Sequence, residues 1–585
     1  MTGTTLTFPA VDAGAVLAGA AHHFPDRVAV RDGEQFLTFA ELHEQARQFA
    51  RGLHEHGIAP GDTVLLLIPN CLWFPVSYWG ALYAGAVASP ANPALPPAAL
   101  AAQLADSGAR AVVAHPASLA SVYAADAPAP HLTVVVPGAA GPTAQGPTAE
   151  GPAAQGPTAE GPTAEAPPPP AGRTVLAAES LLRYGRAERV VRRPDDLAHL
   201  AYTGGTTGRS KAVRVLHRNL LANVAQVAWF RGAARTVLVD GLLGAEQDKE
   251  RATAHHHAPG TATTLAVAPL FHAMGLIGLV GNTLVGTTVV LCARFDPERF
   301  LADVVEHQVS WLGGSPAMYR ALLAAPSAAG LRVESVSNVL SGAAPIDPET
   351  VRRLGELFPN ALVTEGYGLT EATMSLTLHP VDPALGTPPG SVGLPVPGTE
   401  LSIRDLTDPE RELPVGGTGE VWARGPQITD GYHGRDDLTA DQFRDGWLRT
   451  GDVGRVDERG FLFLSGRAKD MLIYKGYNVY PLHLEDVLAG HPAVAAAAVI
   501  GVPHPEAGEI PAAYVVLRPS ATASAEELMA YVAERVAPYQ RVRELHFVPA
   551  LPVSAAGKIL KTELRARHGE LTAETAAGVT TKGDR

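Results

Sequence analysis

Residues 202–213 read Tyr-Thr-Gly-Gly-Thr-Thr-Gly-Arg-Ser-Lys-Ala-Val, a loop rich in glycine and hydroxyl side chains that ends in a lysine. Apolar residues 197–201 precede the loop, and the periodicity of 220–227 after it predicts a helix. Glycine lets an anion approach the backbone, the hydroxyl groups can donate to its oxygens, and the lysine adds charge. The loop therefore predicts a phosphate-binding site, and the alternative is a flexible surface turn.

The loop differs from the Walker loop of many ATPases. Two residues separate Gly208 from Lys211, and Ala212 stands where a Walker loop has a magnesium-binding serine or threonine. Motifs elsewhere in the chain are therefore needed to indicate which class of nucleotide-binding enzyme this is.

Composition bounds the class of protein. The chain has 585 residues, enough for several subdomains, and its 46 basic and 59 acidic residues give a net charge of −13. Such a charge argues against a protein that coats nucleic acid, so an anionic ligand needs a local pocket. Two cysteines are too few for a disulfide framework or a cysteine-based zinc site. With no basic, apolar leader and no apolar run long enough to span a bilayer, we expect a cytoplasmic protein.

Short apolar runs alternate with helical patterns along most of the chain. The predicted strands include Val64–Ile68, Ala111–Ala114, Leu132–Val136, Leu265–Ala268 and Val289–Cys292, and the predicted helices include Phe39–Gly57 and Pro97–Ser107. This alternation predicts layered α/β domains with ligands at the carboxyl ends of the strands.

Two segments break the alternation. Residues 137–172 contain five imperfect Gly-Pro-Thr-Ala-Gln/Glu pentapeptides and then four prolines, so they predict a disordered insertion. A second polar insert, Gly241–Gly260, contains His255-His256-His257. Three consecutive histidines could bind a metal, but their Gly/Ala/Pro surroundings favour an exposed loop.

Further motifs follow the first loop in a fixed order. They are Asn338-Val-Leu-Ser-Gly-Ala-Ala-Pro-Ile346, Gly366-Tyr-Gly-Leu-Thr-Glu371, Trp447-Leu-Arg-Thr-Gly-Asp452, Gly466-Arg-Ala-Lys-Asp470, Lys475-Gly-Tyr477 and Pro552-Val-Ser-Ala-Ala-Gly-Lys558. In this order and spacing the set strongly resembles the adenylate-forming superfamily of acyl-CoA synthetases, adenylation domains and luciferases. The resemblance covers roughly residues 20–568 without the two inserts.

The resemblance implies a two-step reaction. A carboxylate attacks the α-phosphate of ATP and expels pyrophosphate, and a nucleophile such as CoA then displaces AMP; both steps need stabilised charge more than acid–base catalysis. The resemblance assigns the phosphates to Thr203, Gly204, Gly205, Thr206, Thr207 and Lys211, the adenine to Tyr367 against Gly342, Ala343 and Ala344, and the ribose to Asp452 and Arg467. It assigns Mg²⁺ to Glu371, the α-phosphate to Thr370, and the bridge between the attacking carboxylate and that phosphate to Lys558.

The resemblance also predicts the domain organisation. A large N-terminal domain of layered α/β subdomains, residues 1–468, would precede a small mobile α+β domain, residues 469–585, with a flexible tail from about residue 569. Lys469 would be the hinge. After the small domain rotates, the turn at Gly476 would replace Lys558 and leave room for the pantetheine arm of CoA.

The sequence says less about which carboxylic acid is the substrate. His272 lies in Pro269-Leu-Phe-His-Ala-Met-Gly275, which resembles the acyl-CoA synthetase version of a segment that gates the carboxylate. No aspartate stands nearby to pair a substrate ammonium. The apolar, small residues of 311–316, 342–344 and 373–376 are expected to line the acyl pocket, which suggests an aryl or a medium-to-long fatty acid. The chain length of the acid, and whether the enzyme is a monomer or a homodimer, stay open.

Departures from the family pattern leave the second nucleophile open. Gly205 and Ser210 stand where the family usually has serine and proline, and Gln540 and Val553 stand where basic residues are common near the lysine motif. A carrier-protein thiol, an amine or another small nucleophile could therefore replace CoA. A nucleotide-binding regulator without activity is a further alternative, which the joint presence of Lys211, Glu371 and Lys558 disfavours.

Overall fold

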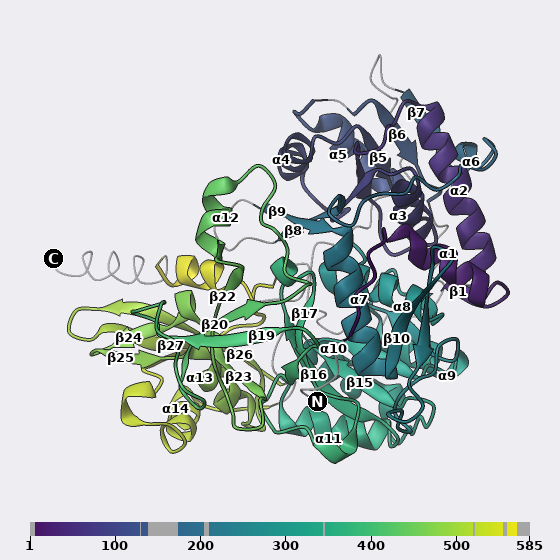
Figure 1. Ribbon diagram of the computed structural model, residues 1–585. Helices are drawn as coiled ribbons and strands as arrows, with labels where there is room; N and C mark the ends of the chain where they lie inside the picture. The colour runs from purple at the N-terminus through teal and green to yellow at the C-terminus, as the bar shows by residue number, and fades with distance from the viewer. Residues whose placement is uncertain are drawn as a thin grey trace, which may run out of the picture.

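The computed structural model describes residues 6–128, 130–138, 174–203, 210–342, 346–518, 521–553 and 559–569. In Figure 1 a large body holds two sheets, and a small lobe that begins at β24 (Leu472–Tyr474) lies at its side. No helix in these ranges is both long and apolar enough to cross a bilayer. The 137–172 insertion falls almost entirely outside the described residues.

The first sheet has seven strands in the order β7-β6-β5-β3-β4-β8-β9. All neighbours are parallel except the β8–β9 hairpin. The strands predicted at Val64–Ile68, Ala111–Ala114 and Leu132–Val136 are confirmed within one residue at each end. The bounds are β3 (Thr63–Leu67), β4 (Val87–Pro90), β5 (Ala111–Ala114), β6 (Leu132–Val135), β7 (Thr174–Ala177), β8 (Leu197–Thr203) and β9 (Lys211–Leu216).

The second sheet has nine strands in the order β18-β17-β16-β15-β14-β12-β13-β1-β2. Its central strands are parallel, and β2, β17 and β18 are antiparallel to their neighbours. The bounds are β1 (Val28–Asp32), β2 (Gln35–Thr38), β12 (Thr263–Ala266), β13 (Thr288–Leu291), β14 (Trp311–Gly314), β15 (Asn338–Ser341), β16 (Leu362–Gly368), β17 (Ser375–Leu378) and β18 (Leu394–Pro395).

Helices cover both faces of both sheets. Side chains of α1 (Gly14–His23), α2 (Phe39–Glu55), α3 (Trp73–Tyr83), α7 (His217–Gly232) and α8 (Ala273–Leu284) join strands of the two sheets in one continuous core. The outer faces carry α4 (Pro97–Ser107) and α5 (Leu119–Ala124) on the first sheet, and α9 (Pro297–Glu306), α10 (Pro316–Ala324) and α11 (Pro348–Leu357) on the second. The layers therefore run helix, sheet, helix, sheet, helix, as the sequence predicts for a layered α/β body.

A third, antiparallel sheet connects the body to the small lobe. It contains β19 (Glu400–Arg404), β20 (Gly419–Arg424), β21 (Phe443–Arg444), β22 (Trp447–Val456) and β23 (Leu462–Arg467). The remaining short elements of the body are α6 (Ala178–Leu181), α12 (Asp436–Gln442), η1 (Pro116–Ser118), η2 (Pro326–Ala328), η3 (Thr370–Ala372) and η4 (Pro383–Leu385). The turn η5 (Ala468–Asp470) follows β23 directly and leads into the lobe.

The expectation of an exposed loop at Gly241–Gly260 is wrong. Its first part is β11 (Leu242–Gln247), which pairs with β10 (Ala234–Val239) as an antiparallel hairpin. The three histidines are partly buried, because His255 hydrogen-bonds through Nδ1 to the Ser337 carbonyl at 3.2 Å and His257 Nε2 lies 2.9 Å from the Ser337 hydroxyl. Polar partners on the second sheet hold this stretch, and composition alone does not show them.

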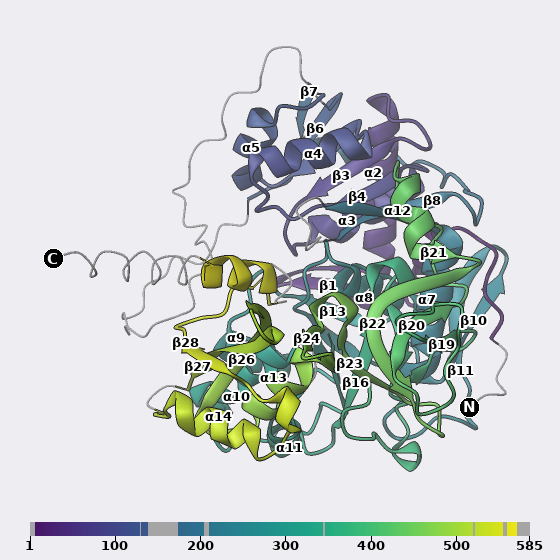
Figure 2. The same ribbon diagram turned by 90° about the vertical axis from the view of Figure 1, so that its left-hand side faces the viewer.

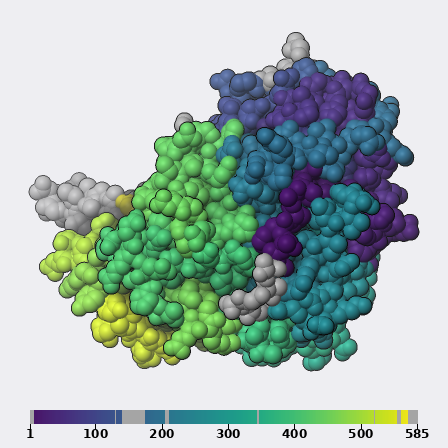
Figure 3. Space-filling model, in the orientation of Figure 1, coloured from purple at the N-terminus to yellow at the C-terminus, as the bar shows by residue number. Residues whose placement is uncertain are grey.

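The small lobe is the α+β unit that the sequence predicts. It contains β24 (Leu472–Tyr474), β25 (Tyr477–Val479), α13 (Pro481–Ala489), β26 (Val494–His504), β27 (Gly508–Leu517), α14 (Ala525–Ala533), η6 (Pro538–Gln540) and β28 (Glu544–Phe547). A last helix spans residues 561–569. The lobe has its own cores, separate from that of the body. It lies beside the body in Figure 2, and its surface borders that of the body in Figure 3.

Candidate active site

Several predicted residues meet at one edge of the second sheet. Strands β12, β14, β15 and β16 are parallel neighbours, so their carboxyl ends share an edge. Gly342 directly follows β15, Tyr367 lies at the end of β16, and Thr370 and Glu371 form the next turn. Crevices at such an edge are where α/β sheets bind ligands.

Tyr367, Asp452 and Arg467 form a hydrogen-bonded group at this edge. The Tyr367 hydroxyl donates to Asp452 Oδ2 at 2.5 Å, and Arg467 Nε lies 3.0 Å from Asp452 Oδ1. The second contact follows from strand register, since Asp452 on β22 is directly opposite Arg467 on β23. Burial and the Asp452 charge raise the pKa of Tyr367 far above its usual range, and the Asp452 carboxylate raises the pKa of Arg467. The group thus holds a buried carboxylate in a fixed position at the border between body and lobe.

A second group joins Glu371 to Lys211 through Tyr432. The Tyr432 hydroxyl donates to Glu371 Oε1 at 2.7 Å, and Lys211 Nζ lies 5.1 Å from the centre of the Tyr432 ring, a cation–π distance. Burial and the Glu371 charge raise the pKa of Tyr432 far above its usual value. The second oxygen of Glu371 makes no hydrogen bond to any described residue, so it can serve as a hard oxygen ligand.

Residues 431–433 explain why Tyr432 lies there. They run along the free edge of β9: Arg214 N–H donates to the Gly431 carbonyl at 3.0 Å, and His433 N–H donates to the Ala212 carbonyl at 2.8 Å. Val213 and Tyr432 form an antiparallel bridge between these bonds. Sequence reasoning missed Tyr432, because its place depends on pairing between segments more than two hundred residues apart.

The ends of the glycine-rich loop lie at the tip of the β8–β9 hairpin. Thr203 and Lys211 are directly opposite each other, and the Ser210 hydroxyl donates to the Thr203 carbonyl at 2.5 Å. The predicted phosphate contacts Gly204, Gly205, Thr206 and Thr207 lie outside the described residues.

Three cations converge near this hairpin. Burial lowers the pKa of Lys469, and the positive charges of Arg467 and Lys211 nearby lower it further. Lys469 lies in η5, directly after Arg467 and Ala468. Positive charges that gather in this way make a favourable place for a polyanion.

The remaining predicted residues at the edge are Gly342, Thr370 and His272. Among the described residues, a methyl group added at Gly342 would find only the Gly366 carbonyl oxygen, at 3.9 Å. Ala343 and Ala344 lie outside the described residues. Thr370 opens η3 and is partly buried. His272 caps α8, and its Nδ1 accepts from Met274 N–H at 3.4 Å.

Asn70, another residue that sequence reasoning missed, fixes the path toward His272. Its amide donates to the carbonyls of Ala266, Ala268 and Cys292 at 3.2–3.3 Å, and its oxygen accepts from Leu270 N–H at 2.8 Å. The nitrogen and the oxygen of the Asn70 amide therefore both hold the segment between β12 and α8 in place. The signal was an asparagine three residues after the end of a buried strand.

The prediction that residues 373–376 line the acyl pocket is corrected in part. Thr373 is buried with its hydroxyl donating to the Gln427 carbonyl at 2.7 Å, and Leu376 is fully buried among Ala423, Ile428 and Leu448. Within this stretch only Met374 is partly exposed. The segment supports the site from behind because the 423–448 region covers it.

The structure does not bring Gly476 to the other predicted residues. Lys475 and Gly476, with φ of 48° and 84°, form the exposed two-residue turn of the β24–β25 hairpin, and Tyr477 stacks on Tyr539 with ring centres 4.8 Å apart. Lys558 lies outside the described residues. The ends of its loop are joined by a bridge between Val553 and Ile559.

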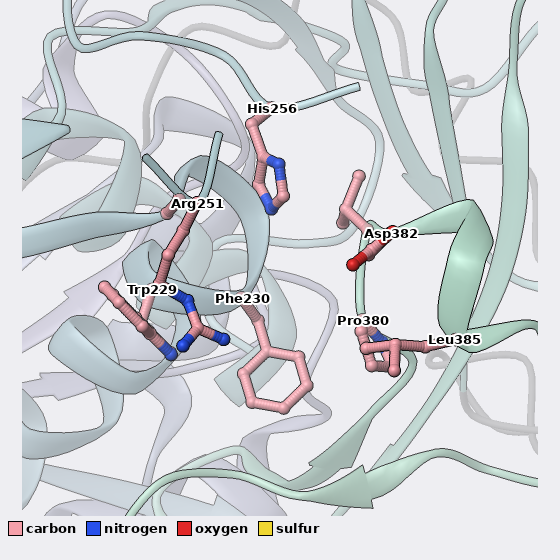
Figure 4. A pocket seen from close by; sticks show the side chains of 9 residues that line it. Trp229, Phe230, Arg251, His256, Pro380, Asp382 and Leu385 are labelled. Atoms are coloured by element: carbon pink, nitrogen blue, oxygen red, sulfur yellow. The ribbon is translucent and has the colours of Figure 1, made fainter. Parts of the chain in front are cut away.

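A separate hollow lies beside the C-terminal end of α7. Figure 4 shows Trp229, Phe230, Arg251, His256 and Asp382 around it. It shares no residue with the two hydrogen-bonded groups of the candidate site.

Comparison with known proteins defines the family. Residues 17–433 match the model of the AMP-binding enzyme family, and residues 483–558 match the model of the AMP-binding enzyme C-terminal domain. The chain is 34% identical to the rice (Oryza sativa subsp. japonica) protein named 4-coumarate–CoA ligase-like 9, over 93% of this chain and 90% of the relative. It is 31% identical to the long-chain-fatty-acid–CoA ligase of Bacillus subtilis, over 94% and 93% of the two chains. The solved structure of a benzoate CoA ligase from Burkholderia xenovorans is similar, with a TM-score of 0.77 and 28% identity over 95% of this chain and 99% of that one.

The chain therefore belongs to the AMP-binding, adenylate-forming enzyme family. It is an ATP-dependent, AMP-forming acyl-CoA ligase, which activates an acid as an acyl adenylate and transfers the acyl group to CoA.

Proposed function

We propose that the chain activates an aryl or a medium-to-long-chain fatty acid, and that the two hydrogen-bonded groups hold ATP. The observation that carries the proposal is the buried Asp452 carboxylate, fixed by Tyr367 and Arg467 at the sheet edge where Gly342 follows β15. A fixed carboxylate can accept from both ribose hydroxyls, and the Tyr367 ring beside a glycine leaves a slot for a flat base. The names of the relatives, which include a coumarate-type and a long-chain fatty acid ligase, support the choice of acid.

The groups around Glu371 and Lys211 would act on the triphosphate. Lys211, Arg467 and Lys469 supply positive charge, Thr370 donates to the α-phosphate, and Glu371 offers a free carboxylate oxygen of the kind Mg²⁺ prefers. Bound there, the ion would neutralise charge on the phosphate oxygens. The role of each protein group is to orient the α-phosphate for in-line attack and to hold the leaving pyrophosphate.

The lobe would supply the residues that change between the two steps. Lys558 would contact the attacking carboxylate and the α-phosphate in the first step, with His272 beside the carboxylate. Because Gly476 is exposed here, the described arrangement suits the first step. Rotation at Lys469 would bring the Gly476 turn inward for CoA.

A panel of acids tests this proposal. Release of AMP is measured for benzoate-, cinnamate- and fatty-acid-type substrates with and without CoA, and acid-dependent exchange of labelled pyrophosphate into ATP reports the first step alone. We expect exchange with aryl or longer fatty acids and thioester only with CoA. Exchange without any CoA-dependent product would favour an amine or a carrier-protein thiol as the acceptor. No exchange with any acid would favour a nucleotide-binding regulator.

A further inference from the structure

Three side chains with metal-binding atoms meet in the small lobe, away from the ATP site. Glu544 and His546 are two residues apart on β28, so both point to the same face of the strand, and His568 reaches them from the helix at 561–569. Glu544 Oε2 lies 3.5 Å from His546 Nε2 and 3.8 Å from His568 Nε2. All three ligand atoms lie within 4.8 Å of one another.

Tyr514 on β27 orients both imidazoles. It is directly opposite His546 in the parallel β27–β28 pairing, and the two rings stack with centres 5.1 Å apart. The Tyr514 hydroxyl lies 2.9 Å from His568 Nδ1. Because Nδ1 of His568 makes that contact, its Nε2 is the nitrogen that faces Glu544. A hydrogen bond to the far nitrogen of a histidine is the usual support of a metal ligand.

The distances distinguish a metal site from a hydrogen-bonded network. An N–H···O bond to a carboxylate is about 2.7–2.9 Å long, shorter than both contacts here. Ligands at about 2.0–2.1 Å around a tetrahedral ion are about 3.3 Å apart, which is close to 3.5 and 3.8 Å. His546 Nε2 is buried and makes no hydrogen bond to any described residue. Such an atom requires a partner.

The neighbouring cations that the structure describes do not occupy the Glu544 carboxylate. Arg543 is turned toward the Tyr474 hydroxyl and the Pro538 carbonyl, and Arg567 pairs with Glu563 on its own helix. Within the described residues, the ion-pair partners of Glu544 are the two histidines.

We propose that Glu544, His546 and His568 bind one transition-metal ion of the zinc type. Two imidazoles and one carboxylate suit Zn²⁺, Co²⁺ or Ni²⁺, whereas Mg²⁺ and Ca²⁺ prefer oxygen ligands throughout. The side chains of Glu544 and His546 are 38% and 36% exposed, which leaves the fourth position open to water. The ion would fasten the last helix to the sheet of the lobe. This helix directly follows the loop that contains Lys558, and its first turn is already tied to α13 by Lys561 and Glu485 at 2.7 Å.

Metal titration of the full chain tests the proposal. The protein is treated with EDTA, dialysed, and titrated with Co²⁺ while the d–d absorption of four-coordinate cobalt is recorded; Zn²⁺ binding is then measured by calorimetry. We expect one ion per chain with tetrahedral absorption, and at least about 100-fold weaker binding in His546→Ala and in His568→Gln. Tyr514→Phe should weaken binding by about 10- to 100-fold, as loss of a ligand-supporting hydrogen bond does.

Two matched controls separate this site from the other histidines. His504→Ala removes an imidazole from the same lobe, and His255→Ala removes one from the histidine triplet; both should bind as the parent does. Circular dichroism confirms that each variant is folded, and His546→Gln replaces His546→Ala if the latter is not. Absence of tetrahedral absorption in the parent, or equal binding by the parent and both ligand variants, would overturn the proposal.

Discussion

Replacing Glu371 with glutamine isolates its charge from its hydrogen bonds. In the structure Oε1 accepts from Tyr432 at 2.7 Å, and the backbone carbonyl accepts from the N–H and the hydroxyl of Thr429 at 3.0 Å each. Glutamine can accept all three. Two unit charges about 4 Å apart interact by about 1 kcal/mol in water and about 4 kcal/mol near a protein surface. Since phosphate oxygens and water keep the other positions on Mg²⁺, we expect a loss of about 2–4 kcal/mol, or about 30- to 1000-fold in rate.

The assay is acid-dependent pyrophosphate exchange measured over a range of Mg²⁺ concentrations. Glu371→Gln should lower the maximal rate by the stated factor and raise the Mg²⁺ concentration needed for half of it. Asp430→Asn is the matched control, because it removes a carboxylate two residues from Tyr432 that pairs with Arg214 at 3.0 Å. An unchanged magnesium dependence, or equal losses in the two variants, would refute the assigned role of Glu371.

Three further changes test the lobe and its border. Lys558→Ala should abolish pyrophosphate exchange but largely spare thioester formation from a supplied acyl adenylate; equal losses would show that its role is wrong. Lys469→Pro should keep exchange and lower CoA-dependent product by orders of magnitude, because proline restricts the pivot and disfavours the helical turn at Ala468; unchanged product would exclude rotation there. Burial and the charge of Asp486 raise the pKa of Glu365 to about 7. The folded state therefore keeps this proton to a higher pH than the unfolded state does. The free energy of unfolding should then decrease as the pH rises from about 4 to about 7. Glu365→Gln should flatten the fall in melting temperature across that window, and parallel curves for parent and variant would contradict this.

Most of the layered body could be predicted because its strands are short apolar runs bounded by turn residues. Val64–Ile68 and Ala111–Ala114 are buried along their whole length, so their composition carries the signal. The Gly241–Gly260 segment could not be predicted in this way. Two of its histidines, His255 and His257, are held by Ser337, a partner about eighty residues later, and no local pattern encodes that contact.

In the candidate site, too, local contacts could be predicted from the sequence and long-range contacts could not. Asp452 and Arg467 belong to consecutive strands, so their pairing follows from a local hairpin register that the motifs already contain. Tyr432 acts through long-range pairing, and its neighbours in sequence do not mark it. Asn70 acts through backbone carbonyls far away in sequence, and its place shortly after a buried strand is its one local signal. The small or apolar residues of 373–376 predict a pocket lining, but the same properties suit a position inside the protein, which is where this stretch lies.

The edge pairing of residues 431–433 with β9 has a consequence for insertions and deletions. Successive side chains of a strand alternate between its faces, so a one-residue shift in register exchanges every inward and outward position. Because β9 is paired on one side with β8 and on the other with Tyr432, a deletion inside it cannot be absorbed by sliding along one neighbour alone. Lys211 would leave the face that meets Tyr432, and Glu371 would lose its link to the hairpin in the same event. Length variation in this region should therefore be confined to the loop ahead of Lys211, with the strand itself fixed in length.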